Sequence, residues 1–149
     1  MSLDVDVTTN GLRLPVSRAR IGEIAQRVLR GERVRNALVS ITLLDRRAIA
    51  RLNAAHLGHR GPTDVISFGF TRATQADPVI GDIYICPQVG RDNARQRHEP
   101  VRRELTRLVV HGVLHILGYD HPENGSREQS AMWARQEKLV SRLAGEAKT

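Results

Sequence analysis

Hydrophobic and polar residues follow two periods along the chain, and the shorter period marks the strands. Residues 3–8 alternate apolar with polar side chains, which is typical of a strand that buries one face. Three later segments are rich in β-branched residues and bounded by loops, at 59–63 and near 76–78. We therefore predict four strands, at residues 3–8, 38–44, 64–70 and 80–86.

Apolar residues spaced three and four apart mark the helices, and capping residues mark where they begin. Ser17 and Asp45 are N-cap residues in front of such segments. Pro87 and Pro100 stand where a helix can begin, because the first N–H of a helix has no partner in any case. The segment Ser126–Gln129 has the spacing of a capping box. We predict five helices, at about residues 18–31, 46–56, 87–96, 100–117 and 126–143.

The order of these elements predicts the fold class. The chain has 149 residues, long enough to bury a core, and no repeat or linker divides it. We expect a single domain over residues 1–149 of the α+β class, in which a small mixed four-stranded sheet packs with about five helices. The single cysteine, Cys86, excludes an intramolecular disulfide and a paired-cysteine zinc site.

Two features of the sequence bear on location. No apolar run approaches the roughly 20 residues that a membrane span needs. The first ten residues carry two acids where a secretory signal would carry basic residues. We expect a cytoplasmic protein that does not contact a membrane.

The charge of the chain is strongly basic, and nearly all of it comes from arginine. Lys and Arg number 23 against 16 Asp and Glu, a net charge of +7, and the only lysines are Lys138 and Lys148. Arginine pairs with phosphate through two parallel hydrogen bonds, which suits a nucleic-acid partner. GC-rich coding also favours arginine over lysine, so the charge alone leaves both interpretations open.

Three of the six histidines fall within residues 111–121 and have the spacing of metal ligands. His111 and His115 are one helical turn apart, so both project from the same face of a helix in the C-terminal part of the chain. Gly118 allows a tight turn that brings His121 to the same ion from outside the helix. Three ligands leave one position open, which is typical of catalytic zinc, although nickel also accepts imidazole ligands.

The same spacing occurs in metzincin proteases, where the residue after the first histidine is a catalytic glutamate. Here that residue is Gly112, so a peptidase of that mechanism would lack its base. Asp120 is expected to cap the turn, or else to orient an imidazole. Glu104 lies about 10 Å before His111 along the helix, too far to be a ligand, and is expected to line a cleft or to face solvent.

The segment His111–His121 resembles the signature of the YbeY family of bacterial endoribonucleases and ribosomal RNA maturation factors. Leu52–Asn53 with Pro62–Phe68 resembles the central block of that family, and Gly81–Ile85 resembles its next strand. The resemblance covers about residues 45–125. It implies one Zn²⁺ per chain, held by His111, His115 and His121.

The resemblance also implies an activity, single-strand-specific endoribonuclease, with roles in maturation of the 3′ end of 16S ribosomal RNA and in ribosome quality control. The implied partners are ribosomal RNA, the ribosome, and ribosomal or assembly proteins. An alternative is a ribosome-assembly or RNA-binding factor with a mainly structural zinc and little turnover. A hydrolase of another substrate, such as a peptide, is a third class that Gly112 disfavours.

One departure from the family pattern concerns a cation. Family members commonly place an arginine where this chain has Leu57, and Arg60 is a candidate substitute. Apart from a metal-bound water, the candidates for a catalytic role are therefore Arg60 and Asp120. For RNA binding we expect contributions from Arg60, Arg91, Arg95, Arg102 and Arg103.

Overall fold

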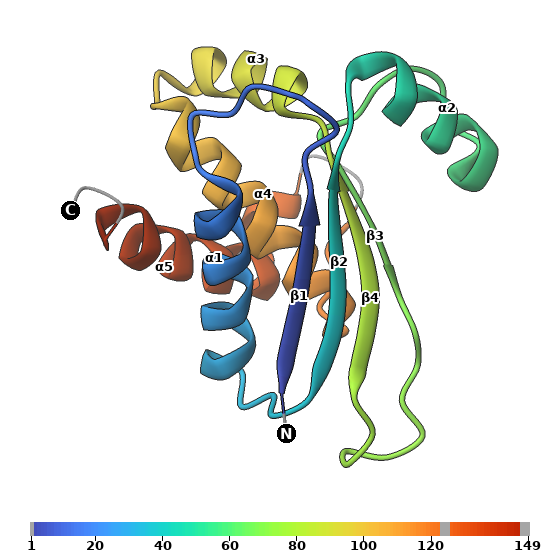
Figure 1. The fold of residues 1–149 in the computed structure, drawn as a ribbon. Coiled ribbons are helices and arrows are strands. Elements are labelled where there is room, and N and C mark those ends of the chain that lie inside the picture. Colours follow the sequence, from blue (N-terminus) through green and yellow to red (C-terminus); the bar gives the residue numbers. More distant parts are fainter. Residues whose placement is uncertain (1, 123–125, 147–149) are drawn as a thin grey trace.

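The strands form one mixed sheet in a computed structural model that describes residues 2–122 and 126–146 (Figure 1). Three neighbouring strands are parallel, and the last is antiparallel to its neighbour. The register pairs Ile41 with Ile83 across the centre of the sheet. The predicted mixed four-stranded sheet is thereby confirmed, in the order β1 (Leu3–Thr8), β2 (Ala37–Leu43), β4 (Val79–Ile85) and β3 (Val65–Gly69).

Five α-helices lie in the part of the chain that the structure describes, as the sequence predicts. They are α1 (Arg18–Gly31), α2 (Arg46–Leu57), α3 (Pro87–Arg97), α4 (Val101–Ile116) and α5 (Ala131–Glu146). Ser17 and Asp45 cap the first two, each accepting a hydrogen bond from a backbone N–H three residues on. None of these helices is long and apolar enough to cross a membrane.

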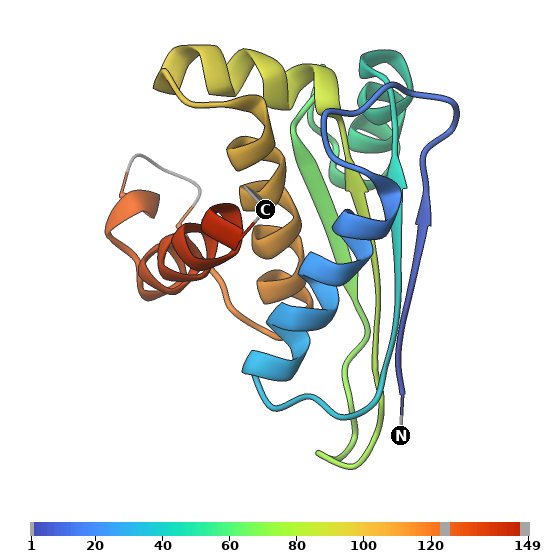
Figure 2. The same ribbon diagram turned by 60° about the vertical axis from the view of Figure 1, so that its left-hand side comes forward.

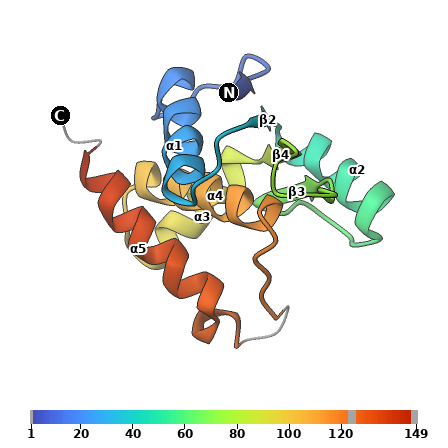
Figure 3. The same cartoon turned by 90° about the horizontal axis from the view of Figure 1, so that it is seen from below.

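The helices cover the two faces of the sheet unequally. Figures 2 and 3 show α1, α4 and α5 on one face and α2 on the other. Alternate residues of the central strands, including Ile41 and Ile83, are completely buried against the first group. A smaller cluster around Ile49, Ile66 and Cys86 lies beneath α2. The main core therefore fixes α4 on the sheet, since each buried isoleucine contributes about 1.5 to 3 kcal/mol.

Two glycines allow α4 to lie unusually close to β4. A Cβ on Gly81 would lie 2.6 Å from Cδ1 of Ile116, and a Cβ on Gly112 would lie 2.7 Å from Cγ2 of Ile83. Neither glycine can carry a side chain unless the isoleucine packed against it moves. The C-terminal half of α4, which carries two of the histidines, is thus held at a fixed depth on the sheet.

The predicted start of the last helix is wrong by one turn. Ser126 begins a short 3₁₀ helix, Arg127–Gln129, and provides no side-chain cap to it. Ser130 precedes α5 instead, where its Oγ accepts a hydrogen bond from the Trp133 N–H at 3.2 Å. The capping-box pattern predicts the wrong start because residues 127–129 form a separate 3₁₀ turn, and the α-helix begins only after it.

Candidate metal centre

The last two turns of α4 and the loop after it bring the three predicted histidines together. His111 and His115 lie one turn apart, and the helix ends at Ile116. Gly118, at a φ of 101°, then reverses the chain, and the Tyr119 N–H donates back to the Leu114 carbonyl. This reversal returns His121 to the face of α4 that carries the other two rings.

The geometry of the three rings is compatible with one shared ion. Their centroids lie 4.6 to 5.0 Å apart, and one ligand nitrogen from each lies within 4.8 Å of the other two. Among residues 2–122 and 126–146, no further Asp, Glu or Cys joins this group. The donor set of three imidazoles suits zinc with one position left for a reactant.

Hydrogen bonds orient the rings for this role. Nδ1 of His111 lies 2.6 Å from Oε1 of Gln136 on α5, and Nδ1 of His121 lies 2.9 Å from the Pro122 carbonyl. Because these acceptors engage Nδ1 as a donor, Nε2 of each ring is left as the basic nitrogen. Each of these two rings thus keeps Nε2 for a metal.

Burial keeps two of the imidazoles neutral. It lowers the pKa of His111 to about 4, against the opposing effect of the hydrogen bond to Gln136. Burial also lowers the pKa of His115, with a further lowering from the neighbouring His121. Since a metal ligand must be deprotonated, the protein environment favours the form of these rings that binds a metal.

Side chains around the loop hold it in place. Asp120 caps the turn, accepting a hydrogen bond from the His121 N–H at 2.8 Å, which is the first of the two roles expected for it. The Tyr119 hydroxyl donates to Glu32 after α1, and Glu32 also pairs with Arg135 of α5 at 2.8 Å. The loop that positions His121 is therefore tied to two helices besides α4.

A cleft of about 610 Å³ opens beside His115. One wall is the end of α4, and the other is the connection from β3 into residues 70–75. Arg72 and the hydroxyls of Thr71 and Thr74 lie in this connection. No local pattern in the sequence points to Arg72, because only the pairing of β3 with β4 and the contact of Gly69 with the Ile116 backbone bring it to the site.

The arginines expected to bind RNA are spread over several elements. Arg60 is exposed in the loop after α2 and is not among the described residues that line the cleft beside His115. Leu57, at the end of α2, is 45% exposed. Arg91 and Arg95 are exposed on α3. Arg102 and Arg103 lie in the first turn of α4, about 12 Å along the axis from His111. Their contact with RNA stays a prediction.

The expectation for Glu104 is wrong, since the residue neither lines this cleft nor faces solvent. Its side chain is 2% exposed and pairs with Arg107, which is itself buried. Arg107 also pairs with Glu137 of α5 at 2.8 Å and with Glu99 at 3.0 Å. These charged side chains can be buried because each is paired with a side chain of opposite charge.

Known proteins are similar to this chain in sequence and in structure. A family model described as "Endoribonuclease YbeY" matches residues 7–144. The chain is 34% identical over 149 residues to the protein of that name from Thermobifida fusca, covering 95% of this chain and 93% of the relative. It is 35% identical over 153 residues to the one from Bacillus licheniformis, covering 95% and 96%. The solution structure of TM1509 from Thermotoga maritima is similar, with a TM-score of 0.68 and 28% identity over 97% of this chain and 92% of that one.

Proposed function

Since the chain belongs to the YbeY family of metal-dependent endoribonucleases, we propose that it cleaves single-stranded RNA with one zinc ion held by His111, His115 and His121. The observation that carries this proposal is the meeting of three imidazoles with no further side chain from the described residues closing the group. Bound there, zinc supplies a Lewis acid and lowers the pKa of a water molecule to about 7.

The chain itself contributes orientation and a place for the substrate. Gln136 and the Pro122 carbonyl fix two of the rings, so that the open side of the centre is defined before RNA arrives. The cleft beside His115 offers Arg72 to a phosphate next to the bond that is cut. Asp120 serves the fold of the loop in this scheme, and Arg60 is left for contacts farther along the RNA.

The cellular role follows from the family. We propose that the substrate is ribosomal RNA, that the reaction matures the 3′ end of 16S ribosomal RNA and serves ribosome quality control, and that it takes place in the cytoplasm. The ribosome, with ribosomal or assembly proteins, is the proposed partner. The net charge of +7 supports a polyanionic partner, because each arginine that neutralises a phosphate releases counterions.

The test combines metal content with the chemistry of the products. Elemental analysis of the native protein should find one zinc per chain. The protein should cleave a single-stranded RNA and leave a duplex of the same sequence intact. A chelator should abolish this cleavage. A 2′,3′-cyclic phosphate at the product end indicates attack by the RNA 2′-hydroxyl. A 5′-phosphate with a free 3′-hydroxyl indicates attack by water.

A pair of histidine variants separates catalysis from structure. His115→Ala should fold and bind RNA but lose cleavage, because it removes one ligand and leaves the core in place. His98→Asn is the matched control, since it removes an exposed imidazole at a φ of 55° that asparagine tolerates. An active His115→Ala protein would refute the proposed centre, and an unfolded one would favour a structural zinc.

A further inference from the structure

Phe70 is the one exposed residue among the five Phe, Tyr and Trp residues of the chain, all of which the structure describes. It is 63% exposed, whereas Phe68, Tyr84, Tyr119 and Trp133 are partly buried. Phe70 directly follows β3, an edge strand of the sheet (Figure 1), and it lines the cleft beside the metal centre. A ring exposed to water gains free energy when another flat apolar surface covers it. Phe70 therefore offers such a surface at the rim of this cleft.

The backbone holds Phe70 close to the metal centre. Its N–H donates to the Ile80 carbonyl at 3.0 Å, which extends the pairing of β3 with β4 by one residue. Gly69, the preceding residue, lies so close to α4 that a Cβ there would be 3.2 Å from both Cα and the carbonyl oxygen of Ile116. Ile116 directly follows His115, so Phe70 and His115 are the chain neighbours of two residues in contact. The backbone of Phe70 is thus in position before a ligand arrives, which lowers the entropy cost of binding.

The other groups of the cleft suit a nucleotide. Arg72 is two residues after Phe70, so their Cα atoms are at most about 7 Å apart. The hydroxyls of Thr71 and Thr74 and the amide of Gln75 belong to residues of the same lining, and none of the described lining residues is an acid. A guanidinium group, neutral hydrogen-bonding groups and a flat ring match the phosphate, the sugar hydroxyl and the base of a nucleotide.

We propose that Phe70 is a base-stacking site for single-stranded RNA, on which one nucleobase lies while Arg72 binds a phosphate of the same or the neighbouring nucleotide. The inference rests on the proposed function, because it takes RNA to be the substrate of this cleft. Every base has a flat π face, so stacking on the ring requires no particular base. A base within a duplex is stacked on both faces, so only an unpaired strand turns a base out onto a ring. The ring thus favours single strands over duplexes.

Exposed apolar side chains beside Phe70 define the competing interpretation, a contact with another protein. Ile80 of β4 is 37% exposed and pairs with Leu38 of β2, which is 58% exposed. Neither is among the described residues that line the cleft, whereas Phe70 shares that lining with Arg72 and His115. The position of Phe70 therefore favours RNA, and Leu38→Ala provides the control that distinguishes the two interpretations.

The first test compares RNA affinity between variants. Phe70→Leu keeps an apolar side chain and removes the flat ring, whereas Phe70→Trp enlarges the ring. Leu38→Ala is the matched control, since it shortens a similarly exposed apolar side chain outside the cleft. The probe is a fluorescein-labelled 2′-O-methyl RNA of ten nucleotides. Its fluorescence anisotropy reports binding, and gel electrophoresis checks that it stays intact.

We expect Phe70→Leu to weaken binding of this probe by about 5- to 150-fold, the range that the loss of one base–aromatic stack produces. The slope of log Kd against log salt should not change, because the substitution removes no cation. Phe70→Trp should bind at least as tightly as the unmodified protein, and Leu38→Ala should bind equally well. Unchanged affinity of Phe70→Leu would overturn the proposal, as would an equal loss in Leu38→Ala.

A second test removes the bases and keeps the ring. The probe is a 2′-O-methyl strand with the same number of phosphates in which every nucleotide is abasic. The unmodified protein and Phe70→Leu should bind this strand with equal affinity, because the ring then has nothing to stack on. A difference between the two proteins as large as that for the intact probe would show that Phe70 acts without a base, and the proposal would be wrong.

The outcomes separate the base-stacking site from the metal centre. Circular dichroism first checks that each variant is folded. If the unmodified protein cleaves RNA and Phe70→Leu binds and cleaves as well, the base-stacking site is wrong and the metal centre stands. If Phe70→Leu loses affinity for the intact probe alone while the zinc-loaded unmodified protein cleaves no RNA, the base-stacking site stands and the endonuclease centre is wrong.

Discussion

Gln136 is the side chain on which the orientation of His111 depends. Its Oε1 lies 2.6 Å from Nδ1 of the histidine, and its Nε2 donates to Glu137 at 3.0 Å. Both the histidine and the glutamine are buried, so the bond between them does not compete with water. A glutamine held at its amide nitrogen presents its oxygen in one direction, which fixes which nitrogen of His111 faces the metal.

Gln136→Leu should therefore weaken zinc binding by about 10- to 100-fold, since it removes the acceptor that fixes the ring. The measurement is a competition titration of the apoprotein with a chromophoric zinc chelator. Gln136→Glu keeps an acceptor oxygen but replaces the amide N–H that donates to Glu137 by a second carboxylate, so it should recover only part of the lost affinity. Unchanged affinity in the leucine variant would show that the ring is oriented by packing alone.

The packing around Gly112 argues against the peptidase alternative. The position that holds the catalytic glutamate in metzincins is directed at β4, where a Cβ would lie 2.7 Å from Cγ2 of Ile83. No side chain at residue 112 has room to act on a substrate. The absence of the glutamate is thus a packing requirement of this fold as well as a chemical difference.

Gly112→Ala should lower the free energy of unfolding, measured by chemical denaturation. Alanine is favoured over glycine in a helix by up to about 1 kcal/mol, but overpacking a core costs about 1 to 3 kcal/mol. The second effect should dominate because Ile83 is completely buried and cannot turn away. Gly145→Ala, with open space around it, should be neutral or stabilising. A stabilised Gly112→Ala protein would contradict the close approach of α4 to β4.

At the scale of the elements, a network of buried charges joins α4 to α5 and α3. Arg107 bridges Glu104 on its own helix and Glu137 on α5. Asn93 of α3 donates to Glu104 at 3.2 Å and to Asp64, just before β3, at 3.0 Å. One guanidinium therefore ties α4 to α5, and its partner Glu104 extends the link to α3.

Arg107→Met should destabilise the protein by about 3 to 5 kcal/mol, because it leaves the buried carboxylate of Glu104 with no cation closer than Arg97, whose Nε lies 3.8 Å away. The change is read from equilibrium unfolding in urea. Adding Glu104→Gln in the same chain should recover part of the stability, since the uncompensated charge is then gone. A destabilisation that the second substitution does not reduce would mean that the arginine acts through its packing.

The same network predicts a pH dependence through Glu137. Burial alone would raise the pKa of this carboxyl, but hydrogen bonds from Arg107 and Gln136 outweigh burial and hold the pKa below its ordinary value of 4.5. A lowered pKa in the folded state means that the contribution of Glu137 to stability is complete above pH 4.5 and is lost as the pH falls through the folded value. Glu137→Gln should be less stable at neutral pH.

The comparison between the two proteins is made by urea unfolding over a series of pH values. Below pH 4.5 the free energy of unfolding of the unmodified protein should fall more steeply than that of Glu137→Gln, so that the two curves converge. Parallel curves would show that this carboxyl has the same pKa in the folded and unfolded chains.

The elements that could be predicted are those with a strong local signal. The alternation in β1 and the caps of α1 and α2 are properties of neighbouring residues, and the structure confirms them. The burial of Glu104 depends on Glu137, Asn93 and Arg107 packing together, which no local pattern contains. The start of α5 is hard to place from the sequence because two serines, four residues apart, compete for the cap.

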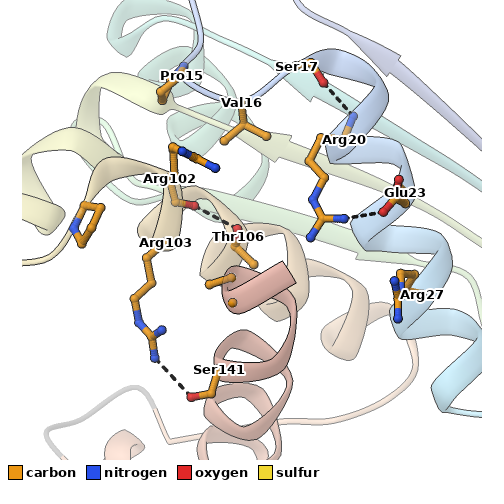
Figure 4. A pocket seen from close by; sticks show the side chains of 13 residues that line it. Pro15, Val16, Ser17, Arg20, Glu23, Arg27, Arg102, Arg103, Thr106 and Ser141 are labelled. Carbon is orange, nitrogen blue, oxygen red and sulfur yellow. Dashed lines mark hydrogen bonds and ion pairs between the residues drawn. The ribbon is translucent and has the colours of Figure 1, made fainter. Parts of the chain in front are cut away.

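At the scale of the whole molecule, the site also has parts that a local sequence pattern predicts and parts that only the tertiary fold brings together. Three histidines within eleven residues carry their own geometry, and the structure brings them together as the spacing predicts. Arg72 reaches the cleft beside His115 only through the pairing of β3 with β4. The hollow of about 1020 Å³ between α1, α4 and α5 (Figure 4) needs all three helices at once, so the sequence shows its arginines only as parts of two arginine-rich stretches.

The placement of the metal centre within the whole fold predicts what removal of the metal does. The centre joins the end of α4 to the loop that follows it, whereas the main core is formed by the sheet with α1, α4 and α5. Zinc at 100 times its Kd would stabilise the folded state by about 2.7 kcal/mol, which for a domain of this size corresponds to about 5 to 11 °C in Tm. Chelation should therefore lower Tm by that order and abolish cleavage, while the circular dichroism spectrum at room temperature stays that of the folded protein.

His115→Ala gives the control for this measurement, because a protein without the centre should show no further change when the chelator is added. Restoring zinc to the unmodified protein should restore both Tm and cleavage, since the apoprotein keeps the fold that positions the ligands. Loss of the folded spectrum on chelation would mean that the ion holds the domain together. That result would favour an assembly factor with a structural zinc over an enzyme, because an ion that the fold requires is usually closed off from substrate by a fourth ligand.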